Sequence, residues 1–437
     1  MNNPPKIIVL DDDPTGSQTV HSCLLLMNWD VETLKLGLAD EQPIFFILTN
    51  TRALTPEKAA QVTREVCHNL KIAIEALEIR DFLVVSRSDS TLRGHYPIET
   101  DVIAQELGKF DAHFLVPAFF EGGRVTLNSI HYLIIDGVKV PVHETEFARD
   151  SVFGYQHSYL PDYVEEKTKG RITSGAVERF LLSELRSGSG DRLMNFTGNQ
   201  CAVVDGEKQT DLDYFAADIL AATQKGKRFL FRSAASLLTS LAQLGPQPLA
   251  PENMAQYKLT QNPGVVLVGS HVSKTTQQLA QLLKEPDVIG IEVEVAALRD
   301  NPSERDRLLL KILQQVQEVY QKQQTPVVYT SRQELLFANV GQRLDFGTAV
   351  SSLLMDVVRG LPAEIGFLIS KGGITSNDVL STGLKLSSAR LLGQILPGCS
   401  MLRTPKEHLK FPNLPVVLFP GNVGDEQGLV TVYHRLK

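Results

Sequence analysis

The chain has 437 residues, which at about 150 residues per domain is the length of two or three domains with sizeable cores. Hydrophobic residues make up 43% and charged residues 21%, ordinary values for a globular protein that exclude a disordered or fibrous chain. The formal net charge of −7 argues against a nucleic-acid-binding protein, which normally carries a basic face.

Short apolar runs alternate with longer amphipathic stretches along the first half, a pattern typical of βαβ units. The stretch from 121 to 190 is less regular, and we expect loops, short strands and one helix there. Strands are predicted at 6–10, 44–48, 82–85, 114–116, 202–204 and 228–231, and helices at 55–77 and 210–224.

Residues 244–264 contain four prolines and no clear period, which indicates a linker. We place it at 246–264, between domains at 1–245 and 265–437. The alternation then restarts with strands at 265–268, 289–295, 327–329, 366–369 and 416–419, and helices near 274–284, 303–321, 344–358 and the C-terminus. The sequence therefore predicts two α/β domains, each a largely parallel sheet flanked by helices, with an active-site cleft between them.

Two further observations concern the compartment. The sequence has no apolar run of the roughly 18–20 residues that span a bilayer, and its start lacks the apolar core of a signal peptide. The four cysteines are scattered without a CxxC pair, which argues against disulfides and a structural zinc site. We therefore expect a cytoplasmic protein that does not bind membranes or nucleic acid.

The first predicted strand ends in Asp11, Asp12 and Asp13, followed by a Pro-Thr-Gly turn. Parallel α/β sheets bind their ligands outside the carboxyl ends of the strands. Three adjacent acids repel one another unless a cation, a proton or hydrogen-bond donors lie nearby. A catalytic base or a magnesium ligand is one interpretation, and a helix cap with a solvated turn is the other. Three acids at one strand end favour the functional interpretation.

A phosphatase is the alternative enzyme. Asp11, Asp13 and Thr15 resemble the DxDxT nucleophile motif of haloacid-dehalogenase-type phosphatases. Asp11 would then attack the phosphorus of a small sugar phosphate, Asp13 would serve as acid and base, and magnesium would be required. However, Lys371 and the acidic stretch 424–426, which would complete the motif set, fall beyond the predicted linker.

Arginines and hydroxyl residues follow the next strands. The strand at 82–85 is followed by SRSDSTLRGHYP, and the strand at 44–48 is followed by Thr49, Asn50, Thr51 and Arg52. Arginine presents a planar fork of donors that suits a carboxylate, whereas Ser, Thr and Asp suit sugar hydroxyls. This combination fits a small polyhydroxylated acid. The structural alternative is that Arg93 and Asp89 simply pair with each other or with helix termini.

Three stretches of the second half place glycine and small hydroxyl residues between a strand and a helix: VVLVGSHVSKTT, FLISKGGITSNDVL and VVLFPGNVGDEQGL. Glycine lets backbone NH groups approach a phosphate, and helix N-termini favour negative charge. Three such loops in one domain favour a nucleotide site. None matches a Walker A loop or the GxGxxG fingerprint, which disfavours a P-loop enzyme and an NAD dehydrogenase.

Taken together, these motifs resemble the four-carbon acid sugar kinase family. The DD-x-TG motif of the family is matched by 12–16, and its K-x-DSTLRG motif is matched by 87–94 with Arg87 in place of lysine. The PAF…GR element is matched by 117–119 and 123–124. In the second half, GS, GG-x-T and GN-x-GDE are matched by 269–270, 372–375 and 421–426, so the resemblance covers nearly the whole chain in the expected order.

The resemblance implies an N-terminal acid-sugar-binding domain, a C-terminal nucleotide-binding domain, and ATP-dependent phosphorylation of a terminal hydroxyl. The implied substrate is threonate, erythronate or a 3-oxo-tetronate. The cofactors would be ATP and Mg2+, with metal ligands unknown, and a homodimer is one expectation for the assembly. The implied nucleotide-binding residues are Ser270, Gly372, Gly373, Ile374, Thr375 and Gly421.

We assign the reacting groups on the same basis. Asp12 would accept the proton of the substrate hydroxyl, and Asp13 is the second candidate or a magnesium partner. Arg52 and Arg93 would hold the substrate carboxylate, with Asp89 and Ser90 on its hydroxyls. A non-enzymatic sensor of sugar acids is a third interpretation of the same residues.

Overall fold

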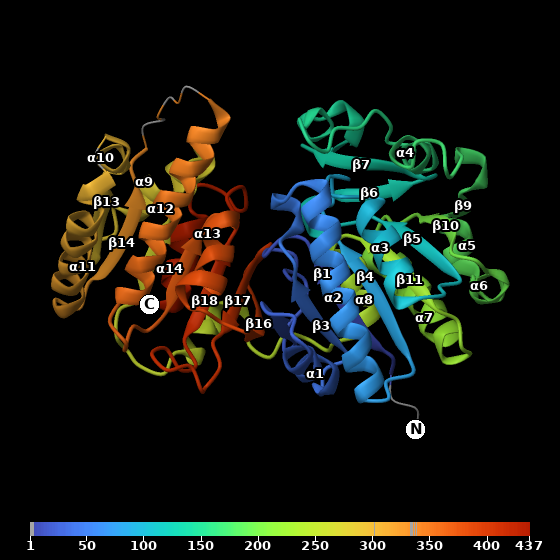
Figure 1. Cartoon of the computed structure of the whole chain (residues 1–437), viewed down its shortest axis with the longest axis horizontal. Helices are drawn as coiled ribbons and strands as arrows, with labels where there is room; N and C mark the ends of the chain where they lie inside the picture. Colours follow the sequence, from blue (N-terminus) through green and yellow to red (C-terminus); the bar gives the residue numbers. More distant parts are fainter. Residues whose placement is uncertain (1–3, 301, 333–334, 336, 338) are drawn as a thin grey trace. The chain divides into compact units, whose positions relative to one another are not determined.

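The computed structural model describes residues 4–300, 302–332, 335, 337 and 339–437. The chain divides into two compact units, unit 1 (Met1–Pro246) and unit 2 (Gln247–Lys437). Each unit holds a largely parallel sheet flanked by helices, which confirms the predicted α/β class (Figure 1). Within the described ranges, no helix combines the length and the apolar character that crossing a membrane requires. The cleft expected between the domains stays a prediction.

The strands of the main sheet of unit 1 pair in parallel, in the order β2-β3-β1-β4-β11-β5-β10-β9. Asp11 at the end of β1 lies opposite Leu48 of β3 and Arg87 of β4, and Arg87 lies opposite Ser233 of β11. The carboxyl ends of these four strands therefore meet at one edge. The bounds are β1 (Lys6–Asp11), β2 (Leu24–Leu26), β3 (Ile44–Leu48), β4 (Phe82–Arg87), β5 (Ala112–Val116), β9 (Glu178–Phe180), β10 (Gln200–Val204) and β11 (Phe229–Ser233).

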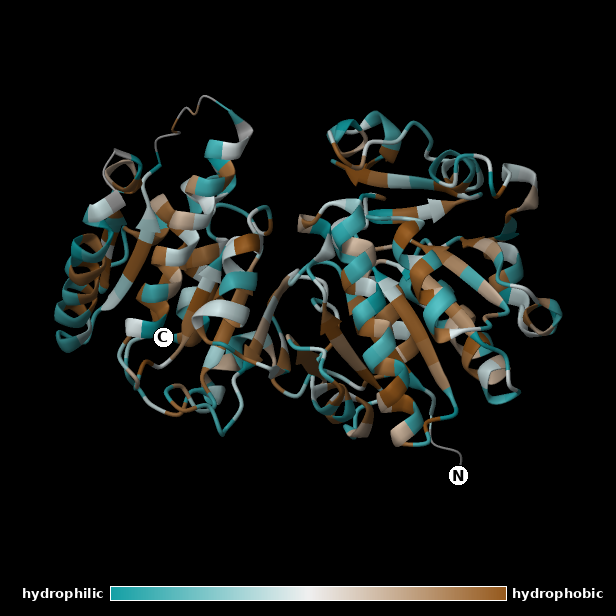
Figure 2. Cartoon of the chain, in the orientation of Figure 1, coloured by the Kyte–Doolittle hydropathy of each residue, from teal (hydrophilic) through white to brown (hydrophobic). Residues whose placement is uncertain are grey.

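Helices pack on both faces of this sheet. α1 (Val31–Ala39), α2 (Pro56–Ala76) and α3 (Ile98–Leu107) share one apolar cluster with β1, β3 and β4. α2 begins where the sequence indicates, because Thr55 caps it and Pro56 fits its first turn. α7 (Gln209–Gln224), which is followed in the chain by β11 and α8 (Ala235–Ala242), packs on the other face, where the rings of Phe215 and Phe114 lie 5.3 Å apart. Strands are largely apolar and helices carry polar outer faces (Figure 2).

The irregular stretch of unit 1 forms a small antiparallel sheet of β6 (Arg124–Leu127), β7 (Ile130–Ile135) and β8 (Val138–Pro141). α4 (Leu160–Lys167), α5 (Leu182–Ser187) and α6 (Gly190–Asn195) follow. The prediction of one helix between 121 and 190 is wrong, since both α4 and α5 form there. Each of them is too short for its apolar period to be visible in the sequence.

Unit 2 has the strand order β13-β14-β12-β15-β18-β17-β16. The first five strands are parallel, and the antiparallel pair β16–β17, which the sequence analysis did not predict, completes the sheet. The strands are β12 (Val265–Val268), β13 (Val288–Val293), β14 (Thr325–Thr330), β15 (Leu368–Lys371), β16 (Ser388–Leu396), β17 (Cys399–Arg403) and β18 (Pro415–Phe419). The helices are α9 (Ser273–Leu282), α10 (Val295–Asp300), α11 (Arg305–Gln321), α12 (Val340–Gly360), α13 (Gly373–Asp378) and α14 (Gly428–Leu436).

Most of the proline-rich segment expected as a linker, from residue 247 on, lies in unit 2. It forms the 3-10 helix η6 (Pro251–Tyr257), and Met254 of that helix is buried in the same apolar cluster as Phe367. The segment is therefore packed against unit 2 although its sequence shows no helical or strand period.

Candidate active site

Asp12 lies directly after β1 and is only 2% exposed. The guanidinium of Arg52 holds it as a fork, with Nη2 2.5 Å from Oδ1 and Nε 3.2 Å from Oδ2. Ser88 directly follows β4, and its Oγ lies 2.7 Å from Oδ2 of Asp12. These donors satisfy the carboxylate and fix its orientation.

Asp13 is the accessible carboxylate of the three, with 24% of its side chain exposed. The amide of Thr15 donates to its Oδ1 at 2.9 Å, and Arg52 Nη1 lies 3.4 Å from its Oδ2. Burial opposes its ionisation, but Arg52 and the hydrogen bonds from Thr15 outweigh this effect and lower the pKa of Asp13. Asp13 is therefore ionised and able to accept a proton from a bound hydroxyl.

Asp11 is enclosed. Burial raises its pKa to about 7, although Arg87, whose Nη1 is 3.5 Å from Oδ1, acts in the opposite direction. The turn closes over it, because a Cβ atom added to Gly16 would lie 2.0 Å from Oδ1. Its Oδ2 has no hydrogen-bond partner among the described residues. A carboxylate closed off in this way is poorly placed to attack a phosphorus atom, as the phosphatase alternative requires.

The loop after β4 places Asp89 and Arg93 together, with Arg93 Nε 2.8 Å from Asp89 Oδ2. This is the pairing that the structural alternative expected. Burial opposes ionisation of Asp89, but Arg52 and Arg93 hold the pKa of its carboxyl well below the usual range. Ser90 is buried in the same loop, and its carbonyl accepts a hydrogen bond from His131. Both predicted arginines therefore contact carboxylates of the chain itself.

Arg124 is the first residue of β6 and differs from Arg52 and Arg93 in its hydrogen bonding. Its Nε is buried without a hydrogen-bond partner in the part of the chain that the structure describes. Burial lowers the pKa of Arg124. The charge of Asp89 acts to raise this pKa, and the charge of Arg93 acts to lower it. The guanidinium of Arg124 lies over the ring of Phe119, 6.0 Å from the centroid. A partly buried cation of this kind is available to an incoming anion.

Arg232 and Glu99 complete the cluster and were missed by the sequence analysis. Arg232 Nη1 donates to Glu99 Oε2 at 2.6 Å, and its Nη2 donates to Ser88 Oγ at 2.6 Å. Arg232 thereby supports the serine that contacts Asp12. The signal was present, since Arg232 lies at the carboxyl end of a strand, but the predicted strand stopped at 231.

A cavity of about 20 Å³ lies beside Ser88, Asp89, Arg93 and Arg232. This space suits about one water molecule and is too small for a four-carbon acid. A substrate would therefore approach from the accessible side, where Asp13, Arg52 and Arg93 are partly exposed.

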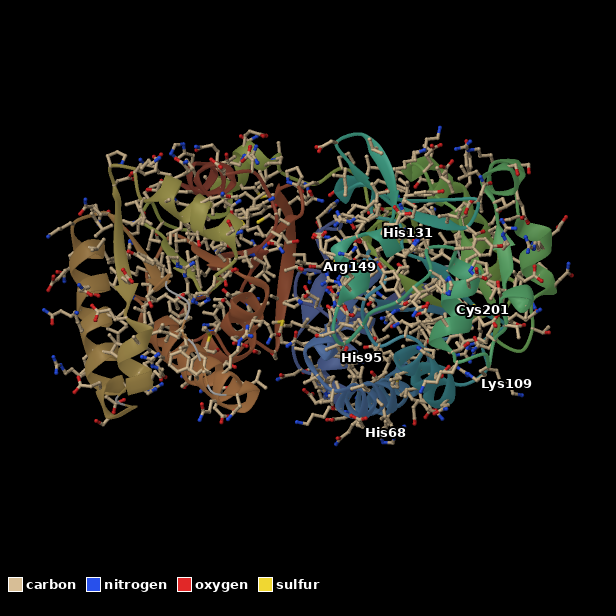
Figure 3. The ribbon with its side chains drawn as sticks, turned by 90° about the horizontal axis from the view of Figure 1, so that it is seen from above. His68, His95, Lys109, His131, Arg149 and Cys201 are labelled. Atoms are coloured by element: carbon tan, nitrogen blue, oxygen red, sulfur yellow. The ribbon has the colours of Figure 1, made fainter. Side chains whose placement is uncertain are left out.

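Two histidines of unit 1, His95 and His131, donate hydrogen bonds to backbone carbonyls, and both are labelled in Figure 3. His95 Nε2 donates to the carbonyls of Thr51 and Leu54 at 3.1 and 3.0 Å. His131 Nε2 donates to Ser90, and burial lowers the pKa of His131 to about 4. Both rings fix the loops around the carboxylates. His131, whose Nδ1 lies 2.9 Å from Thr126 Oγ1, has both ring nitrogens bonded and is not free to act as a base.

The three glycine-containing loops of unit 2 converge, and their binding of a nucleotide stays a prediction. Thr275 Oγ1 lies 3.1 Å from the carbonyl of Gly421 and 3.2 Å from Ser270 Oγ. Gly372 has φ +125° and donates to the carbonyl of Phe419 at 2.8 Å. The loops pack closely, since a Cβ at Gly269 would lie 2.2 Å from Thr375 Oγ1 and one at Gly372 would lie 3.0 Å from Ser270 Cβ. We refer to Ser270, Gly372, Thr375 and Gly421 as the loop junction.

Gly373 and Ile374 belong to the same loop but face open space. A Cβ added to Gly373 would have no atom within 4 Å, and Ile374 is 76% exposed. Their backbone amides open the first turn of α13, where NH groups have no partners within the helix. Both residues are therefore accessible to a ligand. Their contact with a nucleotide stays a prediction.

Lys371 ends β15 and is completely buried. Its Nζ donates to the carbonyls of Pro420 and Gly421 at 2.6 and 3.2 Å and lies 4.0 Å from the centroid of the Phe419 ring. Burial lowers the pKa of Lys371 to about 7. The lysine therefore supports the third loop of the junction. The phosphatase alternative uses Lys371 together with Asp11, but Lys371 belongs to unit 2 whereas Asp11 belongs to unit 1.

Among the described residues, no group of three His, Cys, Asp or Glu side chains forms a preassembled metal site. Magnesium in kinases usually binds to nucleotide phosphates and only one or two carboxylates. Asp425 and Glu426 are exposed on the loop that follows Gly421. The donors present therefore fit a magnesium ion that arrives with a nucleotide.

Comparison with known proteins finds a separate family match in each of the two units. Residues 7–241 match a family described as the sugar-binding N-terminal domain, and residues 265–429 match the nucleotide-binding C-terminal domain. The D-erythronate kinase of Heliobacterium modesticaldum is 22% identical, over 97% of this chain and 95% of the relative. These matches give no support to the phosphatase alternative.

Solved structures share the fold. A Salmonella typhimurium LT2 protein that carries the provisional name tRNA synthase has a TM-score of 0.73 at 20% identity, over 100% of this chain and 99% of that one. A Haemophilus influenzae protein assigned to a domain of unknown function has a TM-score of 0.67 at 17% identity, over 98% of this chain and 100% of that one.

Proposed function

This chain belongs to the four-carbon acid sugar kinase family, and we propose that it transfers the γ-phosphate of ATP to a terminal hydroxyl of a four-carbon acid sugar. The observation that carries the proposal is the presence of two distinct sites. Unit 1 holds carboxylates and arginines at the carboxyl ends of β1 and β4, whereas unit 2 holds the loop junction. The first suits a polyhydroxylated acid and the second suits phosphates.

We assign the base to Asp13. A general base must reach the proton that it accepts, and Asp13 is accessible whereas Asp12 is 2% exposed and held by Arg52 and Ser88. Asp12, which the sequence favoured, would instead position Arg52 between the two carboxylates. Phosphoryl transfer depends mainly on positioning and electrostatics, so this arrangement supplies what the chemistry needs.

The substrate carboxylate would be held by Arg93 together with Arg124. The Nη groups of Arg93 donate no hydrogen bond in the described structure, although Nη1 lies 3.8 Å from Asp150 Oδ2, and Arg124 has no carboxylate partner within it. Arg52 is occupied by Asp12 and Asp13, which makes it a weaker candidate than the sequence suggested. Asp89 and Ser90 would then contact the hydroxyl groups.

Erythronate is the first substrate to test, because the D-erythronate kinase relative is named for it. Threonate and the 3-oxo-tetronates differ from it only around the hydroxyl-bearing carbons, so they belong in the same panel. In unit 2, the loop junction would bind the triphosphate, and Asp425 and Glu426 would hold the magnesium ion that neutralises its charge. The four cysteines are free and buried, which fits the cytoplasm that the sequence predicts. A homodimer stays a prediction.

The test is an assay of ADP formation by the full chain with Mg-ATP and each acid of the panel. We expect ADP only when a four-carbon acid is present, and a phosphorylated acid as the second product. The same protein is also given the corresponding sugar phosphates without ATP, and we expect no release of phosphate. Phosphate release there, or an absence of ADP with every acid despite measurable binding of both ligands, would overturn the kinase assignment.

A further inference from the structure

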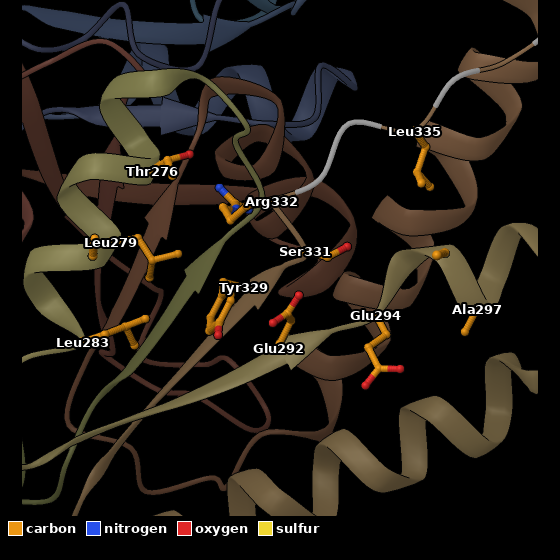
Figure 4. A pocket seen from close by; sticks show the side chains of 12 residues that line it. Thr276, Leu279, Leu283, Glu292, Glu294, Ala297, Tyr329, Ser331, Arg332 and Leu335 are labelled. Carbon is orange, nitrogen blue, oxygen red and sulfur yellow. The ribbon is translucent and has the colours of Figure 1, made fainter.

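A cavity of about 510 Å³ opens on unit 2, between α9 and the carboxyl ends of β13 and β14 (Figure 4). This volume lies in the range of about 300–1,000 Å³ that is usual for small-molecule sites. None of the residues that form the loop junction lines it. The cavity is therefore separate from the loop junction, and its volume is large enough for a part of the ligand other than the phosphates.

Arg332 connects the cavity to the loop junction. It lines the cavity, and its Nη1 donates to the carbonyl of Ser270 at 2.6 Å while Nη2 donates to Thr330 Oγ1 at 2.7 Å. The guanidinium thus fixes the backbone of Ser270 from one side and faces the cavity from the other. A ligand with phosphates at the junction would continue past Arg332 into this cavity.

The walls of the cavity differ in polarity. Leu279 of α9, Leu283 directly after α9 and Ala297 of α10 supply apolar atoms. Tyr329 of β14 supplies an aromatic ring. Glu292 of β13 is the register partner of Tyr329, so the two side chains project from the same face of the sheet (Figure 4). The charge of Glu292 also acts to raise the pKa of Arg332 and the pKa of the Tyr329 hydroxyl.

We propose that this cavity binds the nucleoside part of the nucleotide, with Glu292 accepting hydrogen bonds from the ribose 2′- and 3′-hydroxyls. The base would lie against the apolar wall of α9 and the ring of Tyr329. The order of groups from Ser270 through Arg332 and Glu292 to Leu283 matches the order of phosphate, ribose and base in a nucleotide. This inference rests on the proposed kinase function.

A carboxylate that accepts from ribose hydroxyls distinguishes ribose from deoxyribose. A hydrogen bond to a charged group has a larger energy than one between neutral groups, and its loss corresponds to about tenfold in affinity or more. Inorganic triphosphate has no sugar and would contact only the loop junction. Its affinity therefore reports the phosphate site without the contribution of Glu292.

The test is calorimetry on the full chain with Mg-ATP, Mg-2′-deoxy-ATP and Mg-triphosphate. For the wild type we expect ATP to bind about tenfold more tightly than 2′-deoxy-ATP. Glu292→Ala should weaken ATP binding about tenfold and bring the two nucleotides to equal affinity, with triphosphate binding unchanged. Glu318→Ala, which removes an exposed carboxylate on α11 away from the cavity, is the matched control and should behave as the wild type.

The wild-type comparison needs no variant to fold, and a second variant provides a separate check. Ala280→Trp would fill the cavity from α9 and should weaken ATP binding while leaving triphosphate binding unchanged. Equal affinity of the wild type for ATP and 2′-deoxy-ATP, or wild-type behaviour of Glu292→Ala, would overturn the nucleoside site and leave the kinase proposal standing. Failure of the wild type to bind both ATP and triphosphate would overturn the proposed function and this inference with it.

Discussion

At the scale of single residues, the three adjacent carboxylates after β1 differ because their neighbours differ. Asp11 is enclosed by Gly16, Asp12 is held by Arg52, and Asp13 is accessible. The sequence predicts an acidic cluster at this strand end. It could not predict the separate roles, because these depend on side chains such as Arg52 and Arg87 that come from other strand ends.

The role of Asp13 is tested by Asp13→Asn, which keeps the shape of the side chain and removes its basicity. We expect kcat to fall by at least about 10²-fold, the scale of general-base catalysis, with the Kd of ATP unchanged. Steady-state kinetics and calorimetry measure the two quantities. Asp12→Asn is the companion variant, and near-normal turnover in Asp13→Asn with loss in Asp12→Asn would move the base to Asp12.

Asp11 predicts a dependence of stability on pH. Its pKa is raised from 3.8 to about 7 in the folded protein, so between these values the folded chain binds more protons than the unfolded chain. The stabilisation from the protonated carboxyl is complete below pH 4 and is lost as the pH rises towards 7, at a rate of at most about 1.4 kcal/mol per pH unit. Asp11→Asn lacks this loss.

Denaturant unfolding at pH 5, 6, 7 and 8 measures this effect as the difference between the wild type and Asp11→Asn. We expect the variant to gain stability relative to the wild type as the pH rises, because the wild type must ionise a buried carboxyl. A constant difference across the series would mean that Asp11 has the same ionisation in both states.

The arginines are tested through the charge of the substrate. Arg124→Ala should raise KM for the acid by about tenfold or more, the scale of a lost charge-assisted hydrogen bond, and Arg93→Ala should do the same. With the corresponding neutral polyol, the same variants should have little effect, since the polyol has no carboxylate. Equal losses on the acid and the polyol would assign these arginines to folding or to the transferred phosphate.

At the scale of elements, the long apolar strands could be predicted because each is a continuous buried run. The sequence locates β1, β3, β4, β12 and β18 within a residue or two of their observed bounds. It missed the β16–β17 hairpin, and between 121 and 190 it predicted short strands without locating β6, β7 and β8. It also missed Arg232, because one residue at a strand end decides whether a side chain belongs to the site.

The loop after β15 gives a prediction at this scale, because two adjacent glycines there have different surroundings. Gly372 has φ +125°, which a β-branched residue strains to adopt, whereas a Cβ at Gly373 meets no atom within 4 Å. Gly372→Val should therefore lower the melting temperature of the protein. Gly373→Val should leave it unchanged and raise the Kd of ATP about tenfold or more, since the new side chain occupies the space that a ligand would use.

Thermal unfolding and calorimetry of both variants separate strain from ligand contact. The exposed neighbour gives a control, since Ile374→Val changes the loop surface without adding bulk. Unchanged ATP binding by a stable Gly373→Val protein would remove this loop from the nucleotide site, whatever Gly372→Val does.

At the scale of the whole molecule, the residues proposed for the acid all belong to unit 1 and those proposed for the nucleotide all belong to unit 2. The matches to a sugar-binding and a nucleotide-binding domain cover the same two parts of the chain. The proposed acid site with its arginines and the proposed nucleotide site with its glycine-containing loops therefore use separate sets of residues. Binding of each ligand in the absence of the other should depend only on its own unit.

This separation predicts that substitutions in the two units act independently on binding. Arg93→Ala should weaken the acid and leave the Kd of ATP within about twofold, and Gly373→Val should do the reverse, because residues without shared partners contribute additively. In the double variant, the two binding free energies should equal those of the single variants to within about 0.5 kcal/mol. Calorimetry with each ligand alone measures all four proteins. A tenfold change in ATP affinity caused by Arg93→Ala would show that the arginine of unit 1 also serves the nucleotide, which the assignment of one ligand to each unit forbids.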